Sequence, residues 1–199
     1  MPRFDLPLSL DVEGRRCVVL GGGPEATDKA KKLLFAGAKV QVVASEIEDE
    51  LAERAARGEL GWAARAWDPS DLAGAFLVYV SPEERPSAAE AWALRKRMGF
   101  LMCSIDDPPY CDFASPALVR AGFVTLTIAT GGRAPALAKR LREALAQALA
   151  ASGLEAYANE LARRRDAAPE GERGAEGKRG VEGLGIEVRV TYPAWFRAP

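Results

Sequence analysis

Short apolar runs alternate with segments of helical periodicity along the first half of the chain. Residues 17–21 (CVVLG) have the pattern of a buried strand, and the apolar residues that follow Pro24 recur at helical spacing as far as Gly37. Proline near a helix start fixes φ without removing a needed donor, and glycine commonly follows the last helical residue. The pattern therefore predicts a strand followed directly by a helix.

The same alternation continues to residue 105. Further strands are predicted at 39–45, 61–67, 75–81 and 100–105, and further helices at 46–58 and 87–99. Strands that alternate with helices in this way form a parallel sheet with helices on both faces. The first half of the chain is therefore predicted to have an α/β fold.

The pattern changes after residue 112. Residues 115–122 (SPALVRAG) are predicted to form one or two helical turns, and residues 123–129 (FVTLTIA) a strand. A tight loop is expected over 130–135 (TGGRAP), because it holds two adjacent glycines and a proline.

Residues 136–165 are rich in alanine, leucine and arginine. Leucine recurs every four residues from Leu137 to Leu149, which predicts an amphipathic helix. Ser152-Gly153 is expected to break this helix, and LEAYANELARRR to resume it.

Glycine recurs at a period of three between Gly171 and Gly183. A collagen helix would need many more repeats and prolines, so the scarcity of large apolar residues over 166–183 favours a flexible charged linker. The tail, residues 186–199, alternates like a strand and then becomes aromatic. It could pack on the body of the protein or contact a partner, and the sequence leaves both open.

Composition narrows the functional classes. The 199 residues are 48% hydrophobic and 28% charged, which is typical of soluble globular proteins, and the formal net charge is −1. No excess positive charge is available for a nucleic-acid backbone, and no apolar run approaches the ~18–20 residues of a membrane span. The N-terminus lacks the pattern of a secretory signal, and three cysteines form no disulfide framework, so a cytoplasmic protein is expected.

The chain contains no histidine. This excludes Ser-His-Asp and Cys-His catalysis and any zinc site with histidine ligands. Acid–base chemistry must therefore come from Asp, Glu, Lys, Tyr or Cys side chains.

A glycine-rich loop lies directly between the first strand and the first helix. It fits the pattern G-x-G-x-x-A and consists of Gly21, Gly22, Gly23, Pro24, Glu25 and Ala26. Gly21 would permit the tight turn, Gly23 would let the backbone approach a pyrophosphate at the helix N-terminus, and Ala26 would keep the helix close to the strand. A dinucleotide site is favoured over a tight turn without ligand.

The second predicted strand ends at Ser45-Glu46, just over twenty residues beyond Gly21. Glu46 could accept a hydrogen bond from a ribose 2′-hydroxyl, which would favour NAD over NADP. An acidic residue that merely precedes a helix is an equally good interpretation.

Three blocks of the sequence resemble the precorrin-2 dehydrogenase family, the NAD-dependent module of sirohaem synthase. The blocks are LPLSLDVEGRRCVVLGGG with AGAKVQVVA, then IDDPPYCDFASPALVRAG, and then LTIATGGRAPALAKRLREAL. Their order and spacing match the family over roughly residues 6–150.

The resemblance implies a fold and an activity. It implies a Rossmann domain over 1–112, a dimerisation and helical region over 113–165, and a linker and tail over 166–199. The family oxidises precorrin-2 to sirohydrochlorin with NAD, and some members then insert ferrous iron as sirohydrochlorin ferrochelatases. The implied partners are the tetrapyrrole, ferrous iron as a second substrate, and another copy of the chain in a homodimer, for which the Leu/Ala stripe of 137–149 offers an apolar face.

The resemblance also assigns roles to residues. Asp106 corresponds to the family's catalytic aspartate, and the position of Thr130 lies near the tetrapyrrole in the family. Ser81 is placed with the nucleotide, and Cys103 and Gly131 with the substrate. This chain departs from the family's pattern at residues 81–88 and at Cys103, where the family has asparagine. These departures leave open a non-enzymatic module that binds a nucleotide or tetrapyrrole as a sensor.

The residues themselves support part of this assignment. Asp106 follows a parallel strand, at the end where ligands bind in open α/β sheets, and no histidine competes for the role of base. Arg133 lies in the loop of the third block, where it could hold a substrate carboxylate. Cys103 and Cys111 are eight residues apart and are interpreted as buried cysteines rather than a metal pair.

Overall fold

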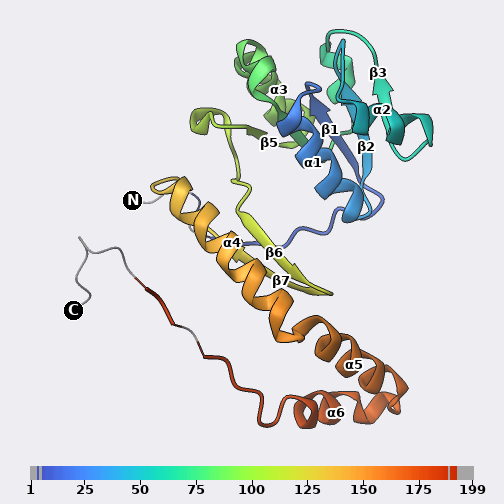
Figure 1. Ribbon diagram of the computed structural model, residues 1–199. Helices are drawn as coiled ribbons and strands as arrows, with labels where there is room; N and C mark the ends of the chain where they lie inside the picture. The colour runs from blue at the N-terminus through green and yellow to red at the C-terminus, as the bar shows by residue number, and fades with distance from the viewer. Residues whose placement is uncertain (1–3, 5, 188, 192–199) are drawn as a thin grey trace. The chain divides into compact units, whose positions relative to one another are not determined.

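A computed structural model describes residues 4, 6–187 and 189–191 (Figure 1). The chain divides into two compact units, the first ending at Ser115 and the second beginning at Pro116. In the part of the chain that is described, no helix is both long and apolar enough to cross a membrane.

The first unit is built on a five-stranded parallel sheet in the order β3-β2-β1-β4-β5. Its strands are β1 (Arg16–Leu20), β2 (Lys39–Val43), β3 (Gly61–Ala63), β4 (Leu77–Val80) and β5 (Leu101–Ser104). All four neighbouring pairs are parallel, which confirms the predicted α/β fold of Rossmann type. From β1 the chain adds β2 and β3 on one side, and it then returns to add β4 and β5 on the other side of β1. The strand order therefore reverses between β1 and β4, which is the topological switch point of the sheet.

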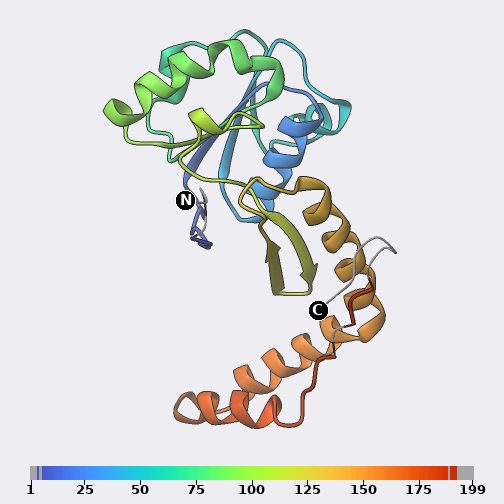
Figure 2. The same ribbon diagram turned by 90° about the vertical axis from the view of Figure 1, so that its left-hand side faces the viewer.

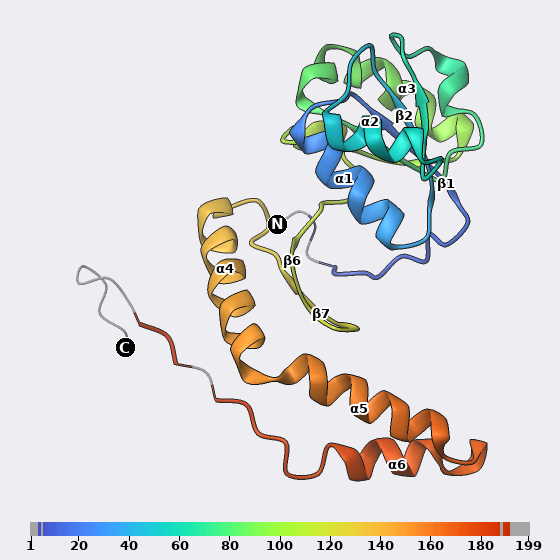
Figure 3. The ribbon, with the colours of Figure 1, turned by 45° about the vertical axis from the view of Figure 1, so that its right-hand side comes forward.

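Three helices cover the sheet: α1 (Pro24–Phe35), α2 (Asp49–Ala56) and α3 (Ala88–Met98). Side chains of β1 alternate between the two faces, because successive residues of a strand point in opposite directions. Val19 packs in one cluster with α1 and α2, and Val18 packs in the other with α3. Figure 3 shows α1 and α2 together on one side of the sheet. The predicted helices are thus confirmed within a few residues.

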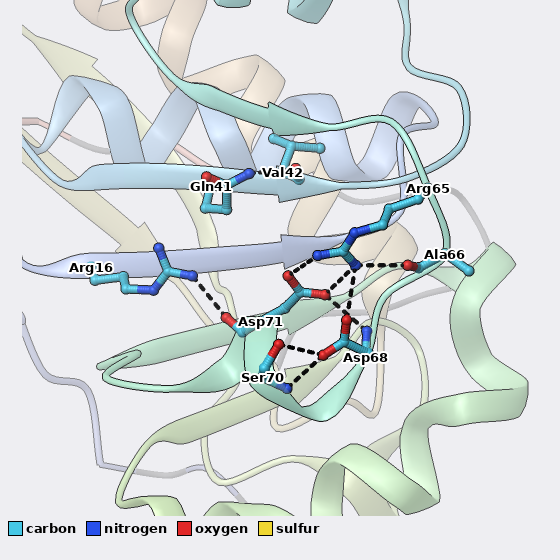
Figure 4. A network of polar contacts seen from close by, with 8 residues as sticks. All are labelled: Arg16, Gln41, Val42, Arg65, Ala66, Asp68, Ser70 and Asp71. Carbon is cyan, nitrogen blue, oxygen red and sulfur yellow. Dashed lines mark hydrogen bonds and ion pairs between the residues drawn. The ribbon is translucent and has the colours of Figure 1, made fainter.

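A polar network ties the segment after β3 back to the sheet (Figure 4). The Arg65 guanidinium donates to both carboxylate oxygens of Asp71, at 2.7 and 2.8 Å, and the backbone N–H of Asp68 donates to the same carboxylate at 2.8 Å. Asp71 lies in the short 3-10 helix η1 (Pro69–Leu72), and its carbonyl accepts a hydrogen bond from the Arg16 side chain at the start of β1. The network fixes the connection from β3 to β4.

Two further 3-10 helices follow the last two strands of the sheet. The first is η2 (Pro82–Ser87), directly after β4, and the second is η3 (Pro108–Tyr110), after β5. Beyond η3 the chain returns to the edge of the sheet, where Cys111 forms an antiparallel bridge with Cys103 of β5.

The second unit begins with an antiparallel hairpin of β6 (Ala117–Ala121) and β7 (Val124–Ile128), with α4 alongside (Figure 2). The prediction of helical turns over 115–122 is therefore wrong, whereas the strand predicted over 123–129 is confirmed. Val119 and Ala121 are buried and Arg120 between them is exposed, which is the period of a strand. Gly122 has φ +58°, a conformation that suits the two-residue hairpin turn.

Helices follow the hairpin: α4 (Pro135–Ser152), α5 (Leu154–Ala167) and, after the 3-10 turn η4 (Glu170–Glu172), α6 (Arg173–Gly180). The break at Ser152-Gly153 confirms the prediction, and Gly153 adopts φ +73° there. Residues 166–183, predicted as a flexible linker, instead contain η4 and α6. The Tyr157 hydroxyl of α5 donates to the Gly180 carbonyl, and a Cβ at Gly180 would meet the Leu161 side chain, so α6 packs on α5.

The tail was predicted to alternate like a strand. Residues 184–187 and 189–191 form no regular secondary structure. Residue 188 and the aromatic segment 192–199 lie outside the described residues.

Candidate functional site

Four loops with candidate site residues follow the carboxyl ends of β1, β2, β4 and β5. Because the strands are parallel, these ends share one edge of the sheet, where open α/β sheets bind ligands. The loops carry Gly21–Gly23, Ser45-Glu46, Ser81–Glu83 and Asp106.

The first two glycines of the loop are required by close packing. Gly21 has φ +107°, and a Cβ there would lie 1.8 Å from the Ser81 Oγ. A Cβ at Gly22 would lie 2.0 Å from the Glu46 carbonyl oxygen. The structure therefore brings Ser81 and Glu46, both predicted as cofactor-binding residues, against the glycine loop.

The third glycine opens α1. Gly23 is the residue before the first helical turn, Pro24 is the first helical residue, and the Gly23 carbonyl accepts the first helical hydrogen bond from Thr27. Ala26 is fully buried in the core, as its predicted role of keeping helix and strand close requires, and Glu25 is exposed. The N–H groups at the start of a helix have no partners within the helix, and together with the helix dipole they favour an anion.

A carboxylate fills this position in the structure. The backbone N–H groups of Gly22 and Gly23 both donate to Glu83 Oε1, at 3.1 and 2.8 Å. Burial alone would raise the pKa of Glu83, but hydrogen bonds from backbone N–H groups, those of Gly22 and Gly23 included, outweigh it and lower the pKa below its usual value. The loop therefore binds an anionic oxygen.

Sequence reasoning missed Glu83, although one signal was available. Glu83 lies three residues after β4, and that loop must face the glycine loop because β1 and β4 are neighbours. An acidic side chain at the carboxyl end of the strand next to a glycine loop is therefore placed to reach it.

The end of β2 is joined to the glycine loop through the backbone. The Glu48 N–H donates to the Gly22 carbonyl at 3.0 Å. Ser45 and Glu46 are both exposed. Their predicted contacts with a ribose stay a prediction.

Asp106 lies exposed in the turn after β5. It adopts φ +57°, one of two positive values among the described non-glycine residues, and aspartate tolerates this conformation better than most residues. The Asp107 N–H donates to the Ser104 carbonyl at 3.1 Å, and the Arg85 side chain donates to the Ile105 carbonyl at 3.2 Å. The turn is thus held from both sides, with the Asp106 carboxylate in solvent.

Cys103 is buried in the core together with Cys111. The Cys111 thiol lies 3.7 Å from the Cys103 sulfur and also donates to the Ser104 carbonyl at 3.1 Å. The contact with Cys111 and burial raise the pKa of Cys103, and burial raises that of Cys17 to about 11. All three cysteines are free thiols, and no group of three or more His, Cys, Asp or Glu among the described residues could hold a metal ion.

The remaining predicted substrate residues lie in the second unit. Thr130, Gly131 and Arg133 form the turn before α4: the Arg133 N–H donates to the Thr130 carbonyl at 3.0 Å, and Gly131 and Gly132 have φ +56° and +75°. The Thr130 hydroxyl accepts from the Ala134 N–H at 3.4 Å, and Arg133 is exposed. These contacts preform the loop within its own unit.

The chain is similar to a described family and to several known proteins. A family model described as "Putative NAD(P)-binding" matches residues 8–117. Siroheme synthase of Gluconacetobacter diazotrophicus is 36% identical over 163 residues, which cover 80% of this chain and 34% of that protein. Siroheme synthase of Photorhabdus laumondii is 35% identical over 161 residues, covering 81% of this chain and 34% of that protein. The chain thus spans about a third of the length of these curated relatives.

A solved structure of SirC, a precorrin-2 dehydrogenase, has a TM-score of 0.71 to this chain. The match covers 90% of this chain and 89% of that chain at 24% identity. At this identity the similarity concerns the fold, including the parallel sheet, the antiparallel pair and the C-terminal helices.

Proposed function

The chain belongs to the family of NAD(P)-binding domains matched over residues 8–117, and we propose that it is an NAD-dependent dehydrogenase that oxidises precorrin-2 to sirohydrochlorin. The observation that carries the proposal is the pair of N–H donors of Gly22 and Gly23, which already hold an anionic oxygen at the N-terminus of α1. The similarity to siroheme synthases and to SirC supports the substrate.

The glycine loop fits a dinucleotide. Gly22 and Gly23 would hold the pyrophosphate, Gly21 and Ser81 would shape the turn beneath it, and Glu46 would accept a hydrogen bond from the ribose 2′-hydroxyl. When bound, NAD accepts the hydride that the macrocycle loses. Because Glu46 would repel a 2′-phosphate, we expect NAD to bind more tightly than NADP, which titration with each nucleotide tests.

Asp106 would take the proton that accompanies the hydride. Its carboxylate is exposed at the same sheet edge as the glycine loop, and the fixed turn around it limits its movement. A carboxylate at such a position can act as a general base or as a proton relay. Each oxidation then converts precorrin-2 and NAD to sirohydrochlorin, NADH and one proton.

The second unit would supply contacts to the tetrapyrrole carboxylates, through Arg133 with Thr130 and Gly131 of the same loop. Cys103, which is buried in the core next to the turn of Asp106, would support the substrate site from below. Ferrous iron is proposed as a substrate of a second reaction, in which Asp106 would remove pyrrole protons. Assays with and without ferrous iron separate the two activities: sirohydrochlorin as the end product would exclude insertion.

A homodimer is part of the proposal. Large apolar side chains stand exposed on the second unit, among them Leu137 and Leu141 of α4. Exposed apolar side chains grouped in this way are typical of a surface that a partner covers.

A further inference from the structure

One oxygen of Glu83 lies in the hollow of the glycine loop. Besides its hydrogen bonds to the N–H groups of Gly22 and Gly23, Glu83 Oε1 lies 2.8 Å from the position that a Cβ at Gly21 would take, and 3.0 Å from that at Gly23. The oxygen therefore occupies space that is open only because these residues lack side chains.

The contact has the chemistry of a bound phosphate. A phosphate oxygen in a loop of this kind accepts hydrogen bonds from consecutive backbone N–H groups and gains from the positive end of the helix dipole. The carboxylate uses the same two donors and the same end of α1, a helix of 12 residues. Two anions cannot share these donors, because they would overlap and repel each other.

We propose that Glu83 is an internal competitor for the dinucleotide: its carboxylate holds the phosphate position in the ligand-free protein and must leave before the pyrophosphate binds. The inference rests on the proposed function in one respect, since it takes the loop to be the nucleotide site.

Glu83 is able to leave. Its side chain is exposed, and among the described residues it forms no ion pair with a lysine or arginine. Its backbone lies in η2, which packs on α3 and is tied to the turn after β5 by the Arg85 side chain. A rotation of the side chain into solvent would therefore free both donors without unfolding an element.

Competition from the Glu83 carboxylate would lower the apparent affinity of the protein for NAD. When only a fraction of molecules has a free site, the apparent Kd rises by the inverse of that fraction. Hydrogen bonds to a charged acceptor are stronger than neutral ones, so the occupied form should dominate. Removal of the Glu83 charge should then tighten NAD binding about tenfold. A carboxylate that merely orders the loop would have the opposite effect, because its removal would loosen the site.

The test compares Glu83→Gln with Glu84→Gln, which removes the same charge one residue further on. Glu84 contacts Ser87 in its own turn and no residue of the glycine loop. We expect the Kd for NAD by calorimetry to fall about tenfold in Glu83→Gln and to stay within about twofold in Glu84→Gln. Glu83→Ala should tighten binding at least as much. An unchanged or higher Kd in both Glu83 variants would overturn the proposal.

A second measurement separates this proposal from the proposed function. The amide signals of Gly22 and Gly23 are followed by NMR while inorganic pyrophosphate is added. If no variant binds NAD but Glu83→Gln binds pyrophosphate more tightly than the unmodified protein, the nucleotide assignment fails and the competition stands. If the Gly22 and Gly23 signals are the same with and without the Glu83 carboxylate, the competition fails whatever the result with NAD.

Discussion

The Glu83 carboxylate accepts a 2.8 Å hydrogen bond from the backbone N–H of Gly23, sixty residues earlier in the chain. This contact joins the carboxyl end of β4 to the first turn of α1. It also shows that the N–H of Gly23 is available to an acceptor from outside its own loop. The nucleotide-binding role of the loop can therefore be tested at this glycine.

Gly23→Val should abolish NAD binding in a folded protein. The Cβ would meet only the mobile end of the Glu83 side chain, at 3.0 Å, and Gly23 does not adopt a positive φ, so folding should tolerate the change. The larger side chain would keep a pyrophosphate from the backbone. Calorimetry with NAD and thermal unfolding measure the two effects, and unchanged affinity would contradict the assignment.

Gly22→Ala is the comparison variant for the stability measurement, because here the added side chain should disturb folding. Its Cβ would lie 2.0 Å from the Glu46 carbonyl oxygen, a backbone atom that cannot turn aside. We expect it to lower the free energy of unfolding by about 1–3 kcal/mol, whereas Gly23→Val should stay within about 0.5 kcal/mol. Equal destabilisation by both would show that the loop is packed differently.

Asp106→Asn should reduce turnover of precorrin-2 by roughly 10²–10⁴-fold. Asparagine also tolerates the left-handed backbone of this position, where φ is +57°, so the turn should persist. NAD affinity should change little, because the glycine loop is untouched. Asp107→Asn, which removes the neighbouring charge, should be milder. Full activity of Asp106→Asn would mean that the residue only shapes the turn.

Asp71 should stabilise the first unit in a way that depends on pH. Hydrogen bonds from Arg65 hold the pKa of Asp71 below its usual value, although burial opposes the shift. The stabilisation is therefore complete above the ordinary pKa of about 3.9 and is lost as the pH falls through the lower pKa of the folded state.

Asp71→Asn should accordingly cost about 1–2 kcal/mol of unfolding free energy at neutral pH, a figure reduced because Arg65 is half exposed. The difference between the two proteins should shrink below about pH 4. Denaturant unfolding at several pH values measures it, and a difference that grows on acidification would contradict this account.

The second unit should form a dimer through α4. Leu137 and Leu141 are 53% and 37% exposed, so aspartate at both positions should leave the unit folded and dissociate the dimer. Gln147→Asp changes an exposed residue of the same helix away from this stripe and should leave the dimer intact. Sedimentation equilibrium distinguishes the states. A 21.3 kDa species alone, at micromolar concentration of the unmodified protein, would refute the prediction.

The sequence predicted the sheet well because periodicity reports burial directly. Buried strands such as 17–21 and 75–81 are continuous apolar runs, and glycine or proline marks their ends. The error at 115–122 arose because alanine, leucine and valine also suit a helix; the alternation of buried Val119 and Ala121 becomes visible only in the hairpin. Helix α6 was missed because its two internal glycines, Gly174 and Gly177, disfavour a helix, whereas packing on α5 offsets that cost.

Sequence alone could predict those parts of the candidate site that a short local motif determines. The glycine loop and the place of Asp106 after a strand can be derived from pattern alone. The carboxylate that fills the loop comes from sixty residues away, and its identification required the β1–β4 pairing.

Oxidation of precorrin-2 by this protein is tested most directly by a single-turnover assay with precorrin-2 and NAD, in which the absorbance of the macrocycle and of NADH is followed. We expect one NADH for each sirohydrochlorin formed, no reaction with Gly23→Val, and slow reaction with Asp106→Asn. Tight NAD binding without any conversion of precorrin-2 by the unmodified protein would contradict the proposed activity.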